Sequence, residues 1–541
     1  MKSKTLYFNP SAIQKNATRF APVWALYGVM WLLILVTMLD SDGSGFWFAS
    51  SWASSLQAMP VLNCAYAFLC AQVLFGDLYN SRMCNSIHAL PMRRESWFVT
   101  HVLSGLGFSL VPNLVIMVLS LLFLEGWWVI APLWLLGMTL QFIFFFGVAV
   151  LSAYCVGNRF AMLLMYGLIN GLSLLVLAML ECLYLPMLHG IVLNTEPFLH
   201  WCPLVWQCSF EYLDLDKMTY AVTLGTGWGY LCLCALVGLV FMGLGLLVYR
   251  KRNLECAGDF LAVRWLRPVF LVLYCLCAGM AGYLFFSLFV GEETLFFLVI
   301  GLILGWFTGK MLLERNLRVF GKKSWLCCGA LVLVLMLSLG LTKLDFLGLT
   351  RWLPNPESVR SVTVWVDGSE KAAHTDPQTL EAIAHIHRYG IENPRANYNG
   401  EADTDVYLEY KMKTGATVSR TYTVDLDTDA GRLLEKLLSQ PAYVLGTDDT
   451  AAFRESLILV TTWDGYLITD YAALFAAMEK DCQAGDMAQT WVFHRDDEHF
   501  TYLEFEYMDA DNMRQHWSVN VFESCENTIA YLKGLGYVPM K

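Results

Sequence analysis

Long apolar runs separated by short polar segments fill the chain up to residue 342. Crossing the bilayer core of about 30 Å takes about 20 helical residues, because each residue adds about 1.5 Å. Segments of this kind lie at 21–39, 56–75, 99–124, 131–154, 160–183, 222–249, 268–287, 295–311 and 325–342. The pattern predicts a polytopic α-helical membrane protein with about nine transmembrane helices, the third of them kinked at Pro112.

From residue 343 onward, apolar and polar residues alternate instead. Residues 361–366 alternate with period two and end at Asp367-Gly368, which predicts a strand followed by a turn. A helix, two strands and a helix should follow, at 377–388, 404–412, 417–424 and 429–438. The same order is predicted again at 456–462, 471–482, 500–508, 515–522 and 525–534. We expect a C-terminal α+β domain over 343–541, made of two βαββα repeats unless the similarity is chance alternation.

Charge divides the chain at the same point. Of the 541 residues, 57% are hydrophobic and 15% are charged, well below the roughly one quarter typical of soluble chains. Residues 1–342 hold 19 Lys and Arg against 15 Asp and Glu, a net charge of +4. Residues 343–541 hold 17 against 32, a net charge of −15. This composition argues against a water-soluble enzyme of this size, a disordered chain and a nucleic-acid-binding chain.

The placement of Lys and Arg predicts the orientation of the helices, since cytoplasmic loops are enriched in both. With a cytoplasmic N-terminus, 18 of the 19 cations before residue 343 lie on the cytoplasmic side, and only Lys217 lies opposite. Nine spans then place the domain over 343–541 outside the cytoplasm. We predict a multi-pass protein of the cell membrane. Its residues 1–20 would be a cytoplasmic or interfacial segment, with a short helix from Asn9-Pro10 or else a frayed tail.

The predicted spans contain few residues that could carry chemistry. The span interiors are almost free of charged residues, and Glu181 lies near a span end. The amide side chains inside the spans favour interhelical hydrogen bonds over ion coupling. They are Asn63, Asn113, Gln141 and Asn170. Residues 305–310 are one residue short of a phosphate-binding loop, and no His-Glu-x-x-His or Gly-x-Ser-x-Gly sequence occurs. We expect no catalytic site, metal or cofactor in this chain. A glycine at every fourth position predicts close helix packing, at Gly301, Gly305 and Gly309.

One predicted cytoplasmic segment, residues 77–98, joins the second and third spans. Its centre reads His88-Ala89-Leu90-Pro91-Met92-Arg93-Arg94, and a basic stretch over 249–259 follows the sixth span. This pattern resembles the bacterial ABC-2-type exporter permeases, the transmembrane subunits of ABC transporters, many of which carry His-x-Leu-Pro-x-x-Arg after the second span. The resemblance implies a six-helix permease domain over 21–254. Three additional helices over 255–342 and an external domain resemble one subgroup from Gram-positive bacteria.

In the resembling family this loop docks onto the ATP-binding subunit. The resemblance therefore implies that residues 77–98 are a coupling segment, with a short helix that ends at Pro91. Its apolar contacts would come from Ile87, Leu90 and Met92, and its polar contacts from His88, Arg93 and Arg94. ATP and Mg²⁺ would be bound by a separate cytoplasmic ATPase subunit, and a second copy of this chain or a related permease would complete the pathway. The alternative interpretation is an ordinary basic loop that touches anionic lipid head groups of the bilayer.

The predicted function is therefore that of a permease subunit of an ABC transporter, with export favoured by the resemblance. A rival hypothesis is a membrane-anchored sensor whose external domain recognises a peptide or an envelope component. Both hypotheses leave an extracytoplasmic ligand open, and neither involves a nucleic acid. Cys202 with Cys208, and Cys482 with Cys525, are candidate disulfide pairs in an oxidising exterior.

Overall fold

The chain forms two compact units in the computed structural model. One comprises Met1–Met179 and Thr195–Met336, and we call it the helical unit; the other, the C-terminal unit, comprises Leu180–Asn194 and Leu337–Lys541. The structure describes residues 9–39, 45–89, 93–124, 126–193, 196–217, 219–290, 295–366, 369, 372–394, 403–447, 449–494, 497–509 and 513–539.

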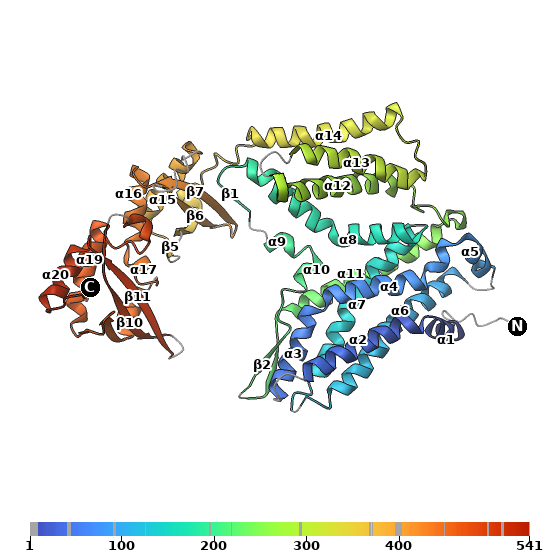
Figure 1. Cartoon of the computed structure of the whole chain (residues 1–541), viewed down its shortest axis with the longest axis horizontal. Coiled ribbons are helices and arrows are strands. Elements are labelled where there is room, and N and C mark those ends of the chain that lie inside the picture. Colours follow the sequence, from blue (N-terminus) through green and yellow to red (C-terminus); the bar gives the residue numbers. More distant parts are fainter. Residues whose placement is uncertain are drawn as a thin grey trace. The chain divides into compact units, whose positions relative to one another are not determined.

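The helical unit consists mainly of long apolar helices (Figure 1). Two of its helices are short and polar, α1 (Pro10–Arg19) and α5 (Ser81–His88). The others are α2 (Ala21–Leu39), α3 (Gly45–Ala58), α4 (Pro60–Leu74), α6 (Arg94–Ser120), α7 (Ile130–Cys155), α8 (Arg159–Met179), α11 (Gly227–Lys251), α12 (Leu266–Val290), α13 (Leu295–Glu314) and the first part of α14 (Lys322–Lys343). Among the described residues, eight helices are long and apolar enough to cross a membrane, or nine if the bent pair α3–α4 is one span. The fold is therefore compatible with the multi-pass helical membrane protein that the apolar runs predict.

The pair α3–α4 differs from the single span predicted over 56–75. Helix α3 ends at Ala58, α4 begins at Pro60, and their axes differ by 57°. Proline breaks a helix because it has no amide proton for the bond to residue i−4 and clashes with that residue's carbonyl. The 15 residues of α4 extend about 22 Å, which is less than the thickness of a bilayer core. Because serines interrupt the apolar residues of α3, the apolar pattern does not predict this helix as a separate element.

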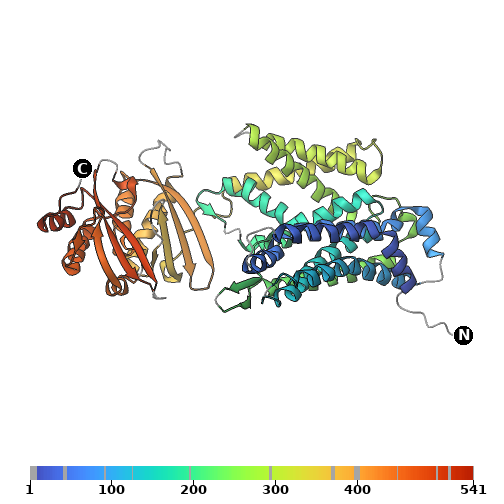
Figure 2. The same cartoon turned by 60° about the horizontal axis from the view of Figure 1, so that its bottom comes forward.

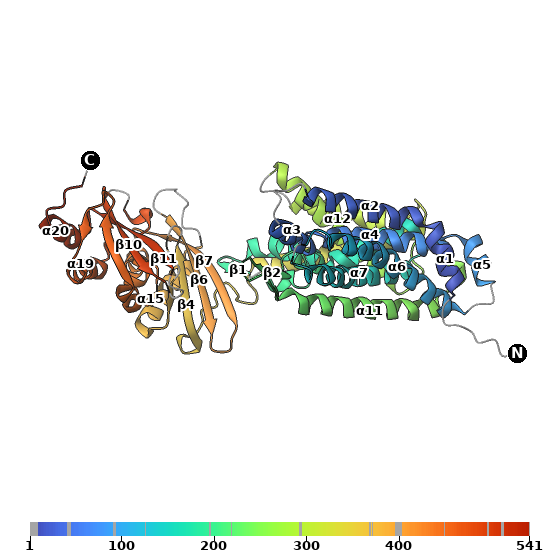
Figure 3. The same ribbon diagram turned by 90° about the horizontal axis from the view of Figure 1, so that it is seen from below.

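Helix α7 packs against α4, α6 and α11 in the helical unit, and Figure 3 shows α11 running alongside α7. Gly147 of α7 faces Gly238 of α11, and a Cβ added at Gly147 would lie 2.1 Å from the Gly238 carbonyl oxygen. These two glycines let the helix backbones approach closely. Trp31, Trp52 and Trp134 join α2, α3 and α7, with ring centroids 4.8 to 5.9 Å apart.

The stretch between α8 and α11 contains only short elements. It includes α9 (Glu196–Leu199), α10 (Pro203–Trp206) and a hairpin of β2 (Leu213–Asp216) and β3 (Ala221–Leu224). The sixth predicted span begins at residue 222, but β3 occupies residues 221–224 and α11 begins at Gly227. All 16 cysteines of the chain are free thiols, so neither candidate disulfide is formed in the structure.

The C-terminal unit contains two antiparallel sheets (Figure 2). Their strand orders are β1-β7-β6-β4-β5 and β11-β10-β8-β9. The strands are β1 (Ile191–Val192), β4 (Val359–Val366), β5 (Ala372–His374), β6 (Asp403–Met412), β7 (Thr417–Asp425), β8 (Leu457–Thr462), β9 (Leu467–Ile468), β10 (His499–Met508) and β11 (Arg514–Phe522). The main helices are α15 (Pro377–Glu392), α16 (Asp429–Leu438), α19 (Tyr471–Ala484) and α20 (Glu526–Gly534), and α17 (Pro441–Val444) and α18 (Thr450–Glu455) connect the two halves.

The two halves share one order of elements: strand, short strand, helix, two strands, helix. This order contains the predicted βαββα pattern, to which the short strands β5 and β9 are added. In the first half, Val364 of β4 pairs with Leu408 of β6, and both are fully buried. In the second half, Val460 of β8 pairs with Phe505 of β10, and both are again fully buried. Alternation with period two thus places one face of each strand in a core.

The edge strand β1 comes from the segment that follows α8, far from the other strands in sequence. Its Ile191 and Val192 pair antiparallel with Arg420 and Ser419 of β7. The preceding Gly190 has a φ of +73°, and a Cβ there would lie 2.1 Å from a ring carbon of Tyr422. The C-terminal domain predicted over 343–541 therefore gains a second segment, which connects its sheet directly to the end of α8.

Candidate functional site

The predicted coupling segment begins as a turn, η1 (Gly76–Tyr79), followed by helix α5. The Asn80 side chain caps α5 by accepting a hydrogen bond of 3.0 Å from the Arg82 amide. Cys84 is buried and Ile87 is half-buried, and both line a cavity of about 20 Å³ beside Leu78. Since an isolated helix of eight residues is unstable in water, this packing against the helical unit holds α5 in place.

Arg252, which directly follows α11, fastens three elements together beneath α5. Its side chain is buried and donates hydrogen bonds of 3.2 Å to the carbonyls of Ala153 and Tyr154 at the end of α7. It also donates one of 3.3 Å to the Leu78 carbonyl in η1. The last carbonyls of a helix have no partner within the helix and carry partial negative charge, so a cation is stabilised there. Arg252 therefore links α7, η1 and α11.

Arg94 and Glu95 make a second link, from the start of α6 to the end of α11. Arg94 donates hydrogen bonds of 3.3 Å to the Tyr249 carbonyl and 2.9 Å to the Arg252 carbonyl. The Glu95 carboxylate lies 3.1 Å from Nε of Arg250. Both contacts stabilise the junction of these helix ends. Hydrogen bonds thus connect η1 to α7 through Arg252, and α6 to the end of α11 through Arg94.

The N-terminal helix α1 packs against α6, which gives the predicted interfacial helix a defined position. The Asn9 amide donates a hydrogen bond of 3.1 Å to Oγ1 of Thr100, and Asn16 donates one of 3.1 Å to Oγ of Ser104. Asp77 of η1 lies 3.8 Å from the guanidinium of Arg19. Burial raises the pKa of Asp77, whereas the charges of Arg19 and Arg159 act to lower it.

The predicted contact residues of the coupling segment fall into three groups. Leu90, Pro91 and Met92 lie outside the described residues, and only the backbone of His88 is described. Ile87 and Arg94 face the helical unit and hold the segment in place. Arg93 is exposed.

The exposed face of α5 consists of residues that were not among the predicted contact residues. Arg82, Met83, Asn85 and Ser86 are exposed, while Cys84 and Ile87 point inward. Their spacing is the sequence signal that could have identified them, because residues three apart share one helix face and the positions between face away. A partner approaching this end of the helical unit would meet a cation, a methionine and two small polar groups.

The amide side chains inside the predicted spans donate hydrogen bonds to nearby groups, although the buried Oδ1 of Asn113 accepts none. Asn63 of α4 donates a hydrogen bond of 2.8 Å to Gln141 of α7, which donates one of 2.8 Å to the Leu56 carbonyl. These are the interhelical bonds that the sequence suggests. Asn113 and Asn170 instead donate within their own helices, to Ser109 Oγ and the Tyr166 carbonyl.

The glycines of α13 lie against α12. A Cβ at Gly301 would lie 2.7 Å from the Ala278 carbonyl oxygen, and one at Gly305 would lie 2.6 Å from the Ala278 Cβ. At Gly309 it would lie 2.8 Å from the Tyr274 ring. All three positions therefore require a residue without a side chain where the two helices meet.

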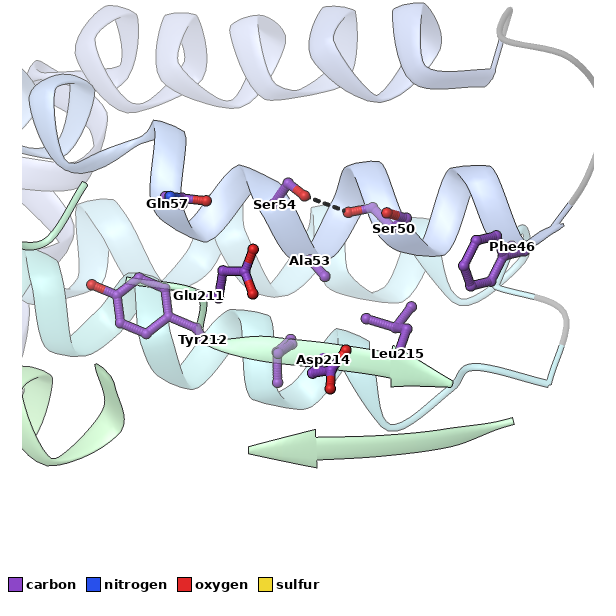
Figure 4. A pocket seen from close by; sticks show the side chains of 10 residues that line it. Phe46, Ser50, Ala53, Ser54, Gln57, Glu211, Tyr212, Asp214 and Leu215 are labelled. Carbon is purple, nitrogen blue, oxygen red and sulfur yellow. Dashed lines mark hydrogen bonds between the residues drawn. The ribbon is translucent and has the colours of Figure 1, made fainter. Parts of the chain in front are cut away.

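A polar pocket of about 170 Å³ lies between α3 and the hairpin β2–β3. Figure 4 shows Ser50, Ser54 and Gln57 along one face of α3, with Glu211 and Asp214 from the segment around β2 opposite them. Two carboxylates beside hydroxyl and amide groups can accept hydrogen bonds from a cationic group. Among the residues that the structure describes, no three His, Cys, Asp or Glu side chains are arranged to hold a metal ion.

No protein-family model, curated protein or solved structure matches this chain. Its class is therefore defined by the fold alone. It has eight described helices of membrane-spanning length and composition, followed by a C-terminal part that contains strands. Helix α5 and the side chains that hold the adjoining turn in place are the features that bear on a particular function.

Proposed function

We propose that this chain is the transmembrane permease subunit of an ABC transporter and that it exports a substrate using ATP hydrolysed by a separate ATPase subunit. The observation that carries the proposal is the position of α5, a short helix with one exposed face that follows the turn η1. Arg252 hydrogen-bonds η1 and the end of α7, and Arg94 at the start of α6 hydrogen-bonds the end of α11, with donor–acceptor distances of 2.9 to 3.3 Å. A partner that binds this helix could displace it, and the displacement would be transmitted to the helical unit.

The composition of the predicted spans supports an ATPase partner over ion coupling, since their interiors are almost free of charged residues. The polar residues Asn63, Gln141, Asn113 and Asn170 are engaged in hydrogen bonds inside the spans. A buried carboxylate or histidine is the usual carrier of a coupling ion. The sequence predicts span interiors that are almost free of such residues. Energy from a separate ATPase is therefore the simplest source under this proposal.

The proposal is tested by purifying the full chain from its native membrane after changing the exposed face of α5. The double substitution Arg82→Glu with Met83→Glu reverses the charge and removes the exposed thioether without touching the buried Cys84. Because contacts at the centre of an interface dominate binding, we expect the amount of co-purifying ATPase to fall several-fold.

The matched control is Leu317→Glu with Arg318→Glu, which changes an exposed apolar residue and an exposed cation in another loop predicted to be cytoplasmic. This pair should leave the co-purifying ATPase unchanged. Equal recovery of ATPase with both pairs would contradict the proposed docking face. ATP hydrolysis by a preparation proven free of other chains would contradict the proposal as a whole.

The sensor hypothesis is the second candidate, and strand β1 is the observation that favours it. Through Ile191 and Val192, the sheet of the C-terminal unit is hydrogen-bonded to the segment that directly follows α8. A ligand bound by that sheet could therefore act on α8. Co-purification of a kinase in place of an ATPase would favour the sensor over the permease.

A further inference from the structure

The loop that follows α14 exposes an unusual amount of apolar surface. Leu344, Phe346 and Leu347 are 77%, 77% and 76% exposed, directly after α14 ends at Lys343. Proteins seldom leave such contiguous apolar side chains in water, and such patches mark sites that contact a partner or a membrane. We call residues 344–349 the apolar loop.

The apolar loop has a defined conformation. Asp345 adopts a left-handed conformation with a φ of 47°, and Gly348 follows with a φ of 64°. The Asp345 carboxylate accepts hydrogen bonds of 2.7 Å from the Leu349 amide and 3.2 Å from the Thr350 amide. A carboxylate that accepts hydrogen bonds from backbone amides of its own loop stabilises that loop as a tight turn. The apolar side chains are therefore presented outward by an ordered backbone.

Arg420 ties this loop to the first sheet of the C-terminal unit. Its buried side chain on β7 donates a hydrogen bond of 3.0 Å to the Leu349 carbonyl. Its guanidinium also lies 5.8 Å from the centre of the Trp352 ring, within the range of a cation–π contact. A surface that binds the apolar loop would therefore also restrain the position of the first sheet.

The position of the loop along the chain indicates which surface this is. The apolar part of α14 from Trp325 to Leu341 has 17 residues and extends about 26 Å, close to the thickness of a bilayer core. The loop begins three residues beyond it, at the depth of the lipid head groups. Lys343 and Arg351 flank the apolar side chains, and Trp352 follows. Cations and tryptophan are both enriched at the boundary between lipid and water.

We propose that the apolar loop is a membrane-interface anchor whose partner is the phospholipid bilayer. Leu344, Phe346 and Leu347 enter the boundary of the acyl chains where α14 leaves the membrane, while Lys343 and Arg351 remain among the lipid phosphates. The base of the C-terminal unit is thereby held at the membrane surface through Arg420. This inference does not depend on the transport function proposed above.

The test uses the full chain in vesicles of phosphatidylcholine and phosphatidylglycerol that contain a radiolabelled phospholipid. The photoreactive residue p-benzoylphenylalanine replaces Phe346 in one variant and Leu344 in a second, so that poor folding of one variant leaves the other. The control is the same replacement at Trp463, which is 67% exposed in the turn after β8.

After illumination, we expect several-fold more lipid label on the chain with the photoreactive residue at 346 or 344 than on the chain with it at 463. Lipid labelling at the level of the control in both loop variants would overturn the proposal. Crosslinks that join two copies of this chain, in place of lipid, would also overturn it and would identify the loop as a protein–protein contact.

Discussion

Asp481 lies fully buried at the end of α19, where its carboxylate holds the start of α20. One oxygen accepts hydrogen bonds from the Asn527 amide and side chain, at 3.0 and 2.7 Å. The other accepts from the amide and hydroxyl of Thr528, at 2.7 and 2.6 Å. The N-cap residue of α20, Cys525, makes no capping bond through its own side chain. Asp481 therefore acts as the cap from a neighbouring helix.

We predict that Asp481→Ala will strongly destabilise the second half of the C-terminal unit. A hydrogen bond to a charged acceptor contributes about 1.5–3 kcal/mol, and bonds that share one carboxylate are not additive. Removing all four should cost about 4 kcal/mol, because buried donors at the start of α20 lose their acceptor. Asp481→Asn keeps one acceptor oxygen and should cost about half as much.

Hydrogen–deuterium exchange of the full protein, followed by mass spectrometry of peptides from α20, measures this loss locally. At 1.4 kcal/mol for each factor of ten, a loss of about 4 kcal/mol accelerates exchange by about 10³. The matched control is Asp470→Ala, which removes an exposed cap whose carboxylate accepts a hydrogen bond of 3.0 Å from the Ala473 amide. An exposed cap contributes about 1 kcal/mol, so exchange should rise only about fivefold. Equal effects of the two substitutions would refute the reasoning.

Three further predictions concern His387, Gly190 and Arg252. Burial lowers the pKa of His387 to about 4, so between pH 6.5 and 4 the histidine is protonated mainly in the unfolded chain. As the pH falls from 7 to 4, the first half of the C-terminal unit should therefore lose about 3 kcal/mol of stability, which hydrogen exchange would measure. Gly190→Val should detach β1, because its side chain would overlap the Tyr422 ring, and exchange in β7 should rise. Arg252→Met leaves three carbonyls without a donor, and it should cost the helical unit about 3 kcal/mol and lower its melting temperature in detergent.

Each of these predictions has a matched control. His385→Gln changes an exposed histidine on the same helix and should leave the pH dependence unchanged, whereas His387→Gln should reduce it. Gly415→Val at a φ of +88° meets no neighbouring atom, so it adds backbone strain of about 1–3 kcal/mol without displacing β1. Lys251→Met removes an exposed cation beside Arg252. A control that reproduces the effect of its partner would contradict the corresponding prediction.

The long helices could be located from the sequence because the length of an apolar run is a local property. Helices α2, α7 and α14 begin and end within three residues of the predicted spans. Pro60 lies inside the single span predicted over 56–75, so the 57° bend between α3 and α4 was not predicted. Trp52 and Leu56 of α3 are fully buried in the hydrophobic core of the helical unit.

The candidate site was harder to predict, because its contacts join residues that lie far apart in the chain. Arg94 was expected to contact a partner, but in the structure it donates a hydrogen bond to the Arg252 carbonyl, 158 positions away. Arg252 in turn donates to carbonyls at the end of α7. A basic residue at a membrane boundary is a topology signal in sequence, and nothing local shows that its guanidinium reaches carbonyls of α7. Helical spacing separates Arg82 and Met83 from the face that holds Cys84 and Ile87, but the packing of Cys84 and Ile87 decides which of these faces is exposed.

The sequence alone determined that an apolar helical part precedes a part that contains strands, the approximate number of apolar helices and the strand–helix order of the C-terminal part. These features depend on composition and on periods of 2 and 3.6 residues, which any short window of sequence contains. Only the tertiary structure decided that Ile191 and Val192 extend a sheet formed more than 150 residues later, and that Arg420 ties this sheet to the apolar loop. A two-residue strand and a single arginine carry no periodic signal, since their partners are defined by distance in space.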